Sequence, residues 1–149
     1  ATRPVTAATL ASNSKIDASH KTTSLTSITD GLVPADENDR TIPYYHWWPK
    51  EGTTEWVSYE FPTEMTVSSA TVYWYDDAPW GGCRVPKSWK VYFKDDSGNW
   101  TPVHNPDKYG VSKGNPNVVN FDPVKTKALK LEIVQPEKNS SGIFEWEVK

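Results

Sequence analysis

The chain contains very little cysteine, and its apolar residues do not form long runs. Cys83 is the one cysteine among 149 residues, so no disulfide can form within the chain, which excludes the small disulfide-stapled frameworks. No stretch reaches the roughly 20 consecutive apolar residues that a membrane-spanning helix needs. Residues 1–4 do not resemble a signal peptide. We therefore expect any export signal to lie outside this sequence, and the chain to be a domain cut from a longer polypeptide.

Positive charge is also scarce. The chain carries 16 Lys and Arg against 19 Asp and Glu, which gives a net charge of −3. Proteins that bind nucleic acid or anionic membranes usually present clustered basic residues, whereas the basic residues here are scattered along the sequence. The composition therefore argues against both kinds of partner.

Aromatic residues and prolines are abundant instead, with eight Trp and twelve Pro. Apolar and polar residues alternate with the period of two that half-buried strands show, in segments 57–61, 72–75, 89–94, 129–133 and 144–148. The prolines argue against long helices, and the helix-like candidate is a short turn over 24–29. We therefore predict one all-β domain over 1–149, an antiparallel β-sandwich or barrel.

Turn chemistry separates the predicted strands. Residues 95–99 read as a hairpin turn, and the pair Asp122-Pro123 reads as another break. Long loops are expected at 30–52, 76–87 and 104–117. Loops of this length are uncommon in compact domains unless they have a function, so these segments are where a site is expected.

Two of these loops are rich in aromatic residues. Flat aromatic faces stack on the apolar C–H faces of a sugar, while fixed polar groups meet its hydroxyls. If both loops lie at the same end of the sandwich, they would form one site. The candidate ligand-binding residues are Tyr44, Tyr45, His46, Trp47, Trp48, Trp80 and Arg84.

Several of these candidates also have a structural interpretation. Adjacent residues of an extended chain point to opposite faces, so at most one of Trp47 and Trp48 need pack in the core. Arg84 suits bidentate contact with hydroxyls or a uronate carboxylate, but a salt bridge to Asp76 or Asp77 that closes the loop is an equal alternative.

The other tryptophans and the cysteine are expected to be structural. Trp56, Trp74, Trp89 and Trp146 sit in alternating strand patterns, which indicates core or sheet-face positions. Cys83 has no neighbouring base of the kind that a nucleophilic thiol needs, so we predict a buried thiol.

No catalytic arrangement is recognisable. Glycosidases need two carboxylates facing one scissile bond, and the spacing of Glu145 and Glu147 on one strand face is what any polar strand face shows. Phosphate-binding glycine loops and Ser-His-Asp arrangements are not apparent either. We therefore predict that the domain is not an enzyme.

The order of several segments resembles a known family. Ile28–Gly31 is followed by Trp47-Trp48, the strand 55–61, the segments 87–92 and 98–103, and a terminal Ile143–Val148. This order is similar to the F5/8 type C, or discoidin-like, domain, whose fold is shared by carbohydrate-binding modules of family 32. Segments 47–57 and 81–89 resemble accessory domains at the C-terminal end of bacterial glycoside hydrolases of the β-L-arabinofuranosidase (DUF1680) type.

The resemblance implies a jelly-roll, galactose-binding-domain-like β-sandwich that binds glycan through loops at one end. It also implies a structural Ca²⁺, whose usual ligands match Asp30, Thr41 and Glu145, with Asn38 as a further candidate. Hard oxygen ligands suit this ion. The loop between Asp30 and Thr41 is longer than the family usually has, and an Asp-Gly pair such as Asp30-Gly31 also occurs in ordinary tight turns.

Three functions remain open from the sequence. The first is a non-catalytic module that tethers a secreted or periplasmic bacterial glycoside hydrolase to glycan, with galactose- or arabinose-type sugars as ligands. The second is a structural accessory domain that packs on the parent glycoside hydrolase domain in cis and binds no sugar itself. The third, a discoidin-type adhesion domain for protein or phospholipid, is disfavoured by the acidic charge balance.

Overall fold

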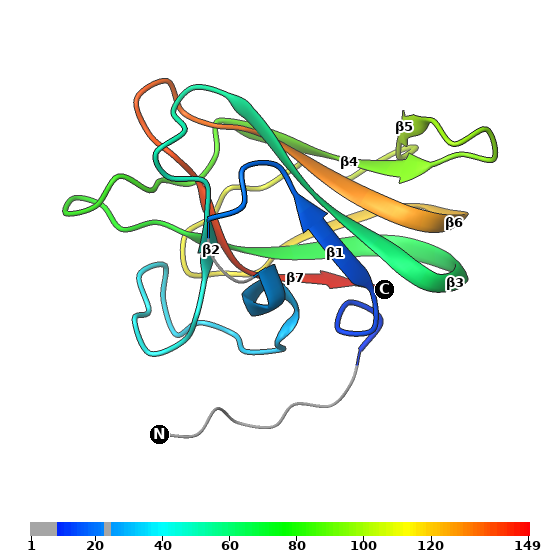
Figure 1. Cartoon of the computed structure of the whole chain (residues 1–149), viewed down its shortest axis with the longest axis horizontal. Helices are drawn as coiled ribbons and strands as arrows, with labels where there is room; N and C mark the ends of the chain where they lie inside the picture. The colour runs from blue at the N-terminus through cyan, green and yellow to red at the C-terminus, as the bar shows by residue number, and fades with distance from the viewer. Residues whose placement is uncertain (1–8, 23–24) are drawn as a thin grey trace.

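The structure is a computed structural model that describes residues 9–22 and 25–149. Within these residues the chain forms antiparallel β-strands and one short helical segment (Figure 1). In chain order these elements are strand β1 (Lys15–Ala18), the 3-10 helix η1 (Leu25–Thr29), and strands β2 (Tyr45–His46), β3 (Thr54–Tyr75), β4 (Ser88–Lys94), β5 (Trp100–Pro102), β6 (Asn117–Val134) and β7 (Gly142–Val148). In this part of the chain, no helix has the length and apolar character needed to cross a membrane.

The two longest strands, β3 and β6, take part in both layers of the sandwich. They pair antiparallel from Thr54↔Val134 to Val72↔Asn117, with register shifts between Glu60 and Met65 and between Val67 and Ser69. Such shifts bend a strand pair. One layer contains β1, the first part of β3, the last part of β6, β4 and β5. The other contains β2, β7 and the remaining parts of β3 and β6, so the predicted antiparallel β-sandwich is confirmed.

Aromatic side chains from the two layers meet in the core. Tyr59 and Trp146 stack with ring centroids 3.8 Å apart, and the Tyr59 hydroxyl donates to the carbonyl of Trp146 at 2.7 Å. Trp74 and Trp89 meet edge to face at 5.3 Å. The core positions predicted for these three tryptophans are confirmed by their burial. Trp56 is half-buried, as a sheet-face position requires.

Most predicted boundaries match the structure, with corrections at β6 and at the predicted loop 30–52, which contains the short strand β2. The turn at 95–99 joins β4 to β5, and Gly98 has the positive φ of 82° that such turns often need. The predicted break at Asp122-Pro123 is wrong, because β6 continues through it. These two residues fall where β6 changes partner register, between Asn120↔Ser69 and Val124↔Val67, so the missing proline N–H interrupts no registered pair.

Two sequence predictions touch residues outside the described ranges. The predicted turn over 24–29 agrees with η1 at Leu25–Thr29, while Ser24 lies outside the described residues. The segment 1–4, considered as a signal peptide above, also lies outside them.

Candidate functional site

Three loops meet at one end of the sandwich, at the left of Figure 1. The segment after β2 bonds to the loop before β7 through the Trp47 N–H and the Ser141 carbonyl at 3.0 Å. The loop between β3 and β4 also bonds to the loop before β7, since the Arg84 N–H donates to the Ser140 carbonyl at 2.8 Å and the Ser140 N–H donates to the Gly82 carbonyl at 3.0 Å. Backbone bonds therefore hold together loops that are far apart in the sequence.

A depression of about 190 Å³ lies where these loops meet. Its lining residues come from both aromatic loops: Tyr44, His46, Trp48, Asp77, Gly82 and Cys83. The structure thus brings the two segments to the same end, which the sequence raised as a condition for a single site. The volume is below the roughly 300–1,000 Å³ of pockets for drug-sized ligands, so the depression suits a smaller ligand.

Trp48 forms the exposed aromatic wall of the depression. Its side chain is 45% exposed, and its benzo ring lies directly against the backbone of Gly82. A Cβ atom at Gly82 would come within 2.2 Å of Trp48 Cζ3. The absence of a side chain at Gly82 is therefore what allows the indole to lie over this loop.

Tyr44 and His46 add a second aromatic face and a hydrogen-bonding group. The Tyr44 ring stacks on Tyr75 at 3.7 Å with an interplanar angle of 9°, and it is half-buried. His46 Nδ1 accepts a hydrogen bond from the Trp48 N–H at 3.2 Å, so the neutral ring carries its proton on Nε2. Burial lowers the pKa of His46, which favours this neutral form and leaves the Nε2–H as a donor.

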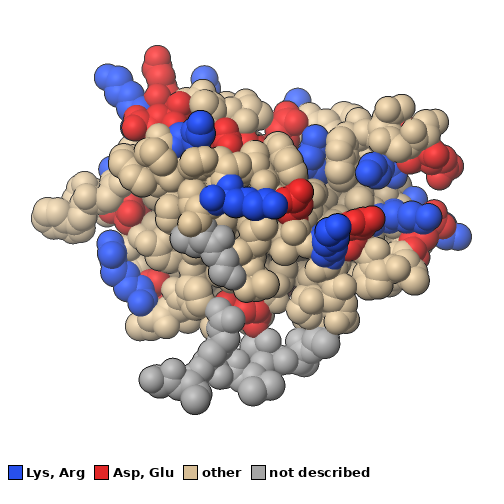
Figure 2. Space-filling model, viewed as in Figure 1, with Lys and Arg blue, Asp and Glu red and all other residues tan. Residues whose placement is uncertain are grey.

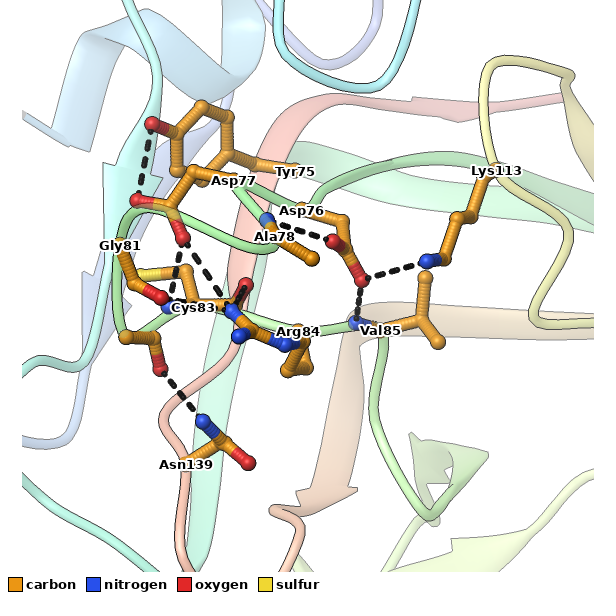
Figure 3. Close-up of polar contacts among 11 residues, drawn as sticks. Tyr75, Asp76, Asp77, Ala78, Gly81, Cys83, Arg84, Val85, Lys113 and Asn139 are labelled. Atoms are coloured by element: carbon orange, nitrogen blue, oxygen red, sulfur yellow. Dashed lines mark hydrogen bonds and ion pairs between the residues drawn. The ribbon is translucent and has the colours of Figure 1, made fainter.

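Two buried carboxylates hold the loop between β3 and β4 (Figure 3). Asp77 accepts hydrogen bonds from the Cys83 N–H at 2.8 Å and from the Tyr75 hydroxyl at 3.2 Å. Asp76 accepts from the N–H groups of Ala78 and Val85, each at 3.0 Å, and lies 3.5 Å from Lys113 Nζ. The neighbouring aspartates therefore anchor opposite sides of one loop.

Arg84 contributes to the same loop scaffold. Its Nη1 donates to the carbonyls of Gly81 at 2.7 Å and Cys83 at 2.8 Å, and lies 3.6 Å from Asp77 Oδ1. The structure thus favours the salt-bridge alternative for Arg84 over direct contact with a ligand. Asp77 is the partner, since Asp76 is paired with Lys113.

The remaining aromatic candidates separate into buried and exposed residues. Tyr45 and Trp47 are fully buried, which corrects their prediction as ligand-binding residues. They occupy alternate positions of an extended segment and face the core, where their side chains donate to the carbonyls of His20 and Ser19. Trp80 is 86% exposed on the loop between β3 and β4 but does not line the depression.

Three lining residues were absent from the predicted set, namely Asp77, Gly82 and Cys83. Gly81-Gly82 between aromatic residues is a signal for close backbone approach that could have pointed to Gly82. Cys83 is 5% exposed, and burial raises the pKa of its thiol to about 12. The prediction of a buried, structural cysteine is confirmed.

The predicted metal ligands are partly brought together. Glu145 in β7 is buried and accepts from the Gly31 N–H at 3.0 Å. Burial, with the Asp30 carboxyl beside it, raises the pKa of Glu145 to about 9. The Thr41 hydroxyl instead donates to Asp39 at 2.6 Å, in a loop longer than the family pattern.

Two buried oxygens in the predicted metal set have no hydrogen-bond partner, Glu145 Oε1 and Asn38 Oδ1. Over residues 9–22 and 25–149, no three His, Cys, Asp or Glu side chains are grouped so as to hold a metal alone. A cation here would therefore need amide, hydroxyl or carbonyl oxygens beside Asp30 and Glu145, as Ca²⁺ commonly uses. The donor chemistry and the unpartnered oxygens fit that ion.

Solved structures similar to this chain belong to carbohydrate-active proteins. A chain of the Streptococcus pneumoniae β-galactosidase BgaA is 20% identical with a TM-score of 0.76, covering 89% of each chain. A family 32 module of a Clostridium perfringens family 89 protein, in complex with GalNAc-β-1,3-galactose, is 17% identical with a TM-score of 0.68, covering 95% of this chain and 99% of that one. The family 32 module of C. perfringens NanJ, in complex with galactose, is 17% identical with a TM-score of 0.64, covering 93% and 95%.

At these identities the structural likeness establishes the fold, which is that of the discoidin- and galactose-binding-like modules. The sequence itself matches the F5/8 type C domain family over residues 10–147. This match covers nearly the whole chain and agrees with the order of segments from Ile28 to Val148. The chain therefore belongs to the F5/8 type C domain family.

Proposed function

We propose that this domain is a non-catalytic carbohydrate-binding module whose ligand site is the depression around Trp48. The single observation that carries the proposal is the convergence of Tyr44, His46 and Trp48 with the loop at 77–83 on one open depression. The family match and the sugar-bound modules of the same fold support a sugar as the ligand. The prediction that the domain is not an enzyme is confirmed on the same ground.

The site provides the contacts that a pyranose needs. The exposed indole of Trp48 offers an apolar face for the C–H groups of the ring, and the Nε2–H of His46 donates to a hydroxyl. Each aromatic stacking contact is worth about 0.5–1.5 kcal/mol beyond area burial. A shallow site of this kind is expected to bind a single sugar with a Kd near about 1 mM.

Sugar-bound modules of the same fold support a candidate sugar class. Galactose and GalNAc-β-1,3-galactose are bound by family 32 modules of this fold, so galactose-type sugars are the first candidates and L-arabinose the second. Weak binding is useful in a module tethered to an enzyme, because effective concentration rather than affinity keeps the enzyme on its substrate. The proposed setting is a secreted or periplasmic bacterial glycoside hydrolase that carries this domain.

We also propose that Asp30 and Glu145 hold a structural Ca²⁺, with Asn38 supplying a further oxygen. The support is the buried Glu145 Oε1 and Asn38 Oδ1, which have no hydrogen-bond partner, and the closeness of two acidic groups. Bound Ca²⁺ would neutralise these groups and fix the loop after η1 against β7.

The sugar proposal is tested by titrating the domain with galactose, N-acetylgalactosamine and L-arabinose while tryptophan fluorescence and heat are recorded. We expect a saturable response with the wild type, and an affinity about two- to tenfold lower in Trp48→Ala because one stacking contact is lost. Trp80→Ala, which changes an exposed tryptophan outside the depression, serves as the matched control. If no sugar produces a saturable response, the domain is instead a structural accessory domain of its parent enzyme.

A further inference from the structure

A second hollow lies on the outer face of the layer that contains β1, β4 and β5. Its volume is about 290 Å³, and residues of five strands line it, including Lys15 of β1, Glu60 of β3, Lys94 of β4, Trp100 of β5 and Lys127 of β6. Glu60 lies six residues beyond the start of β3, or about 20 Å along the strand. The hollow is therefore separate from the loop depression at the other end.

Lys94 and Lys127 of this hollow have no carboxylate within ion-pair distance among the described residues, whereas Lys15 is close enough to Asp17 to help lower the pKa of that carboxyl. Among the described residues, no ion pair joins Lys15, Lys94 or Lys127 to a carboxylate, although several other lysines are paired. Asp17, which also lines the hollow, is paired with Lys21 at 2.8 Å. Three lysines thus line one hollow, in which Glu60 is an acid that no ion pair joins to another described residue.

Aromatic rings restrain the cations at one side of the hollow. Lys94 Nζ lies 5.4 Å from the centre of the Trp100 ring. Lys130, which does not line the hollow and lies 3.7 Å from Glu132, contacts the same ring, with its Nζ 5.0 Å from the centre of Trp100 and 5.1 Å from that of Tyr92. Cation–π contacts of this kind hold flexible lysine side chains in place, which lowers the entropy cost of binding an anion.

The lysines of the hollow are far apart in the sequence, and the fold brings them together. Figure 2 shows Lys and Arg side chains, interleaved with acidic ones, toward the right-hand side, where β4 ends and the labels of β3 and β6 stand in Figure 1. A hollow that combines unpaired cations with a free carboxylate suits a ligand that has both an anionic group and hydroxyl donors. A phosphodiester chain has few hydroxyl donors to offer Glu60, and the net charge of −3 opposes a polyanion as large as nucleic acid.

We propose that this hollow is a second glycan site, which binds the carboxylate of a uronic acid unit in an acidic polysaccharide. Lys94 and Lys127 hold the carboxylate, and Glu60 accepts hydrogen bonds from hydroxyls of the same or the neighbouring sugar. The site is additional to the proposed loop site and does not depend on it. Engagement of one polymer by both sites would give the domain avidity on substrates that carry both neutral and acidic sugars.

The test is calorimetric titration of the intact domain with an oligogalacturonate at low and high salt. We expect Lys94→Gln/Lys127→Gln to weaken binding by up to about 25-fold, since each of the two lost charge pairs contributes up to about 1 kcal/mol, or about fivefold. The control Lys108→Gln/Lys138→Gln removes the same charge from exposed loop positions and should bind like the wild type. Higher salt should weaken binding, because dissolved ions screen the attraction between exposed charges. The screening length is about 10 Å at 0.1 M and becomes shorter as the salt concentration rises.

The Trp48→Ala variant separates this proposal from the loop site, because its oligogalacturonate binding should remain. Loss of oligogalacturonate binding in Trp48→Ala, with normal binding in the Lys94/Lys127 variant, would place the acid sugar at the loop site and overturn the proposal. Absence of binding by the wild type would overturn it as well. Equal binding of single-stranded DNA would show a general anion site instead, and so would overturn the assignment to a uronate.

Discussion

Trp48 keeps its position at the depression because Gly82 has no side chain. Replacement of Gly82 by Ala would place a methyl group 2.2 Å from the indole, and an exposed side chain yields by swinging into solvent. We expect Gly82→Ala to lower sugar affinity about two- to tenfold through the lost stacking contact. The melting temperature should change little, because Trp48 leaves an exposed position rather than the core.

This prediction is checked by titrating Gly82→Ala with the best sugar and recording thermal unfolding in parallel. Ser88→Ala, an exposed change at the start of β4, provides the control. Wild-type affinity in Gly82→Ala would show that the indole does not contribute to binding in the position seen here.

Cys83 lines the depression yet is expected to be chemically inert. Burial raises its thiol pKa to about 12, from an ordinary value of 9.0. The buried thiol stays protonated at pH values where the thiol of the unfolded chain ionises. It therefore contributes stability that is fully present below the unfolded pKa of 9.0 and is lost as the pH rises from there toward 12. At pH 8.5 the native protein should therefore react with a thiol-specific reagent at least about a hundredfold more slowly than the denatured protein. Rapid, complete labelling of the native protein would contradict the buried state.

The loop between β3 and β4 contributes both to the stability of the fold and to the lining of the depression. Its Asp77 carboxylate satisfies the Cys83 N–H and the Tyr75 hydroxyl and lies beside Arg84. In Asp77→Ala these buried donors lose their acceptor, which costs about 1–3 kcal/mol for each unsatisfied group. The urea midpoint of unfolding should fall clearly, and sugar affinity should fall with it because Cys83 and Gly82 line the depression.

The matched control for this loop is Asp96→Ala, which changes an exposed aspartate in the turn after β4. Its stability should remain within about 0.5 kcal/mol of the wild type. Equal stability of the Asp77 and Asp96 variants would mean that the anchoring bonds do not hold the loop.

At the scale of the whole molecule, the proposed Ca²⁺ ties the loop after η1 to the last strand. Ca²⁺ at about 100 times its Kd should stabilise the folded state by about 2.7 kcal/mol and raise the melting temperature by several degrees. Glu145→Gln should abolish this response. Without Ca²⁺, this variant should melt close to the wild type, because the raised pKa keeps Glu145 protonated at neutral pH and the neutral amide of Gln replaces a neutral carboxyl.

The measurement is thermal unfolding after chelation, with Ca²⁺ or Mg²⁺ added back. Glu137→Gln, an exposed change in the loop between β6 and β7, controls for lost negative charge. Identical melting curves with and without Ca²⁺ would remove the metal from this domain.

The sequence by itself determined the class of the fold and its core. Alternation over segments such as 89–94 and 129–133 reports which side of a strand is buried, and this is a local property. The same local rule indicated that at most one of Trp47 and Trp48 need pack inside. It also placed aromatic residues in two long loops, which is where the depression lies.

The tertiary structure decided which of those aromatic residues face the ligand side and what accompanies them. Tyr45 and Trp47 are buried because β2 pairs with β7, a contact between residues about a hundred positions apart that no local pattern contains. Likewise, Asp122-Pro123 reads as a break locally, but β6 continues because its register shifts there. Lysines scattered along the sequence meet on one face for the same reason, since strand pairing sets neighbours without regard to separation along the chain.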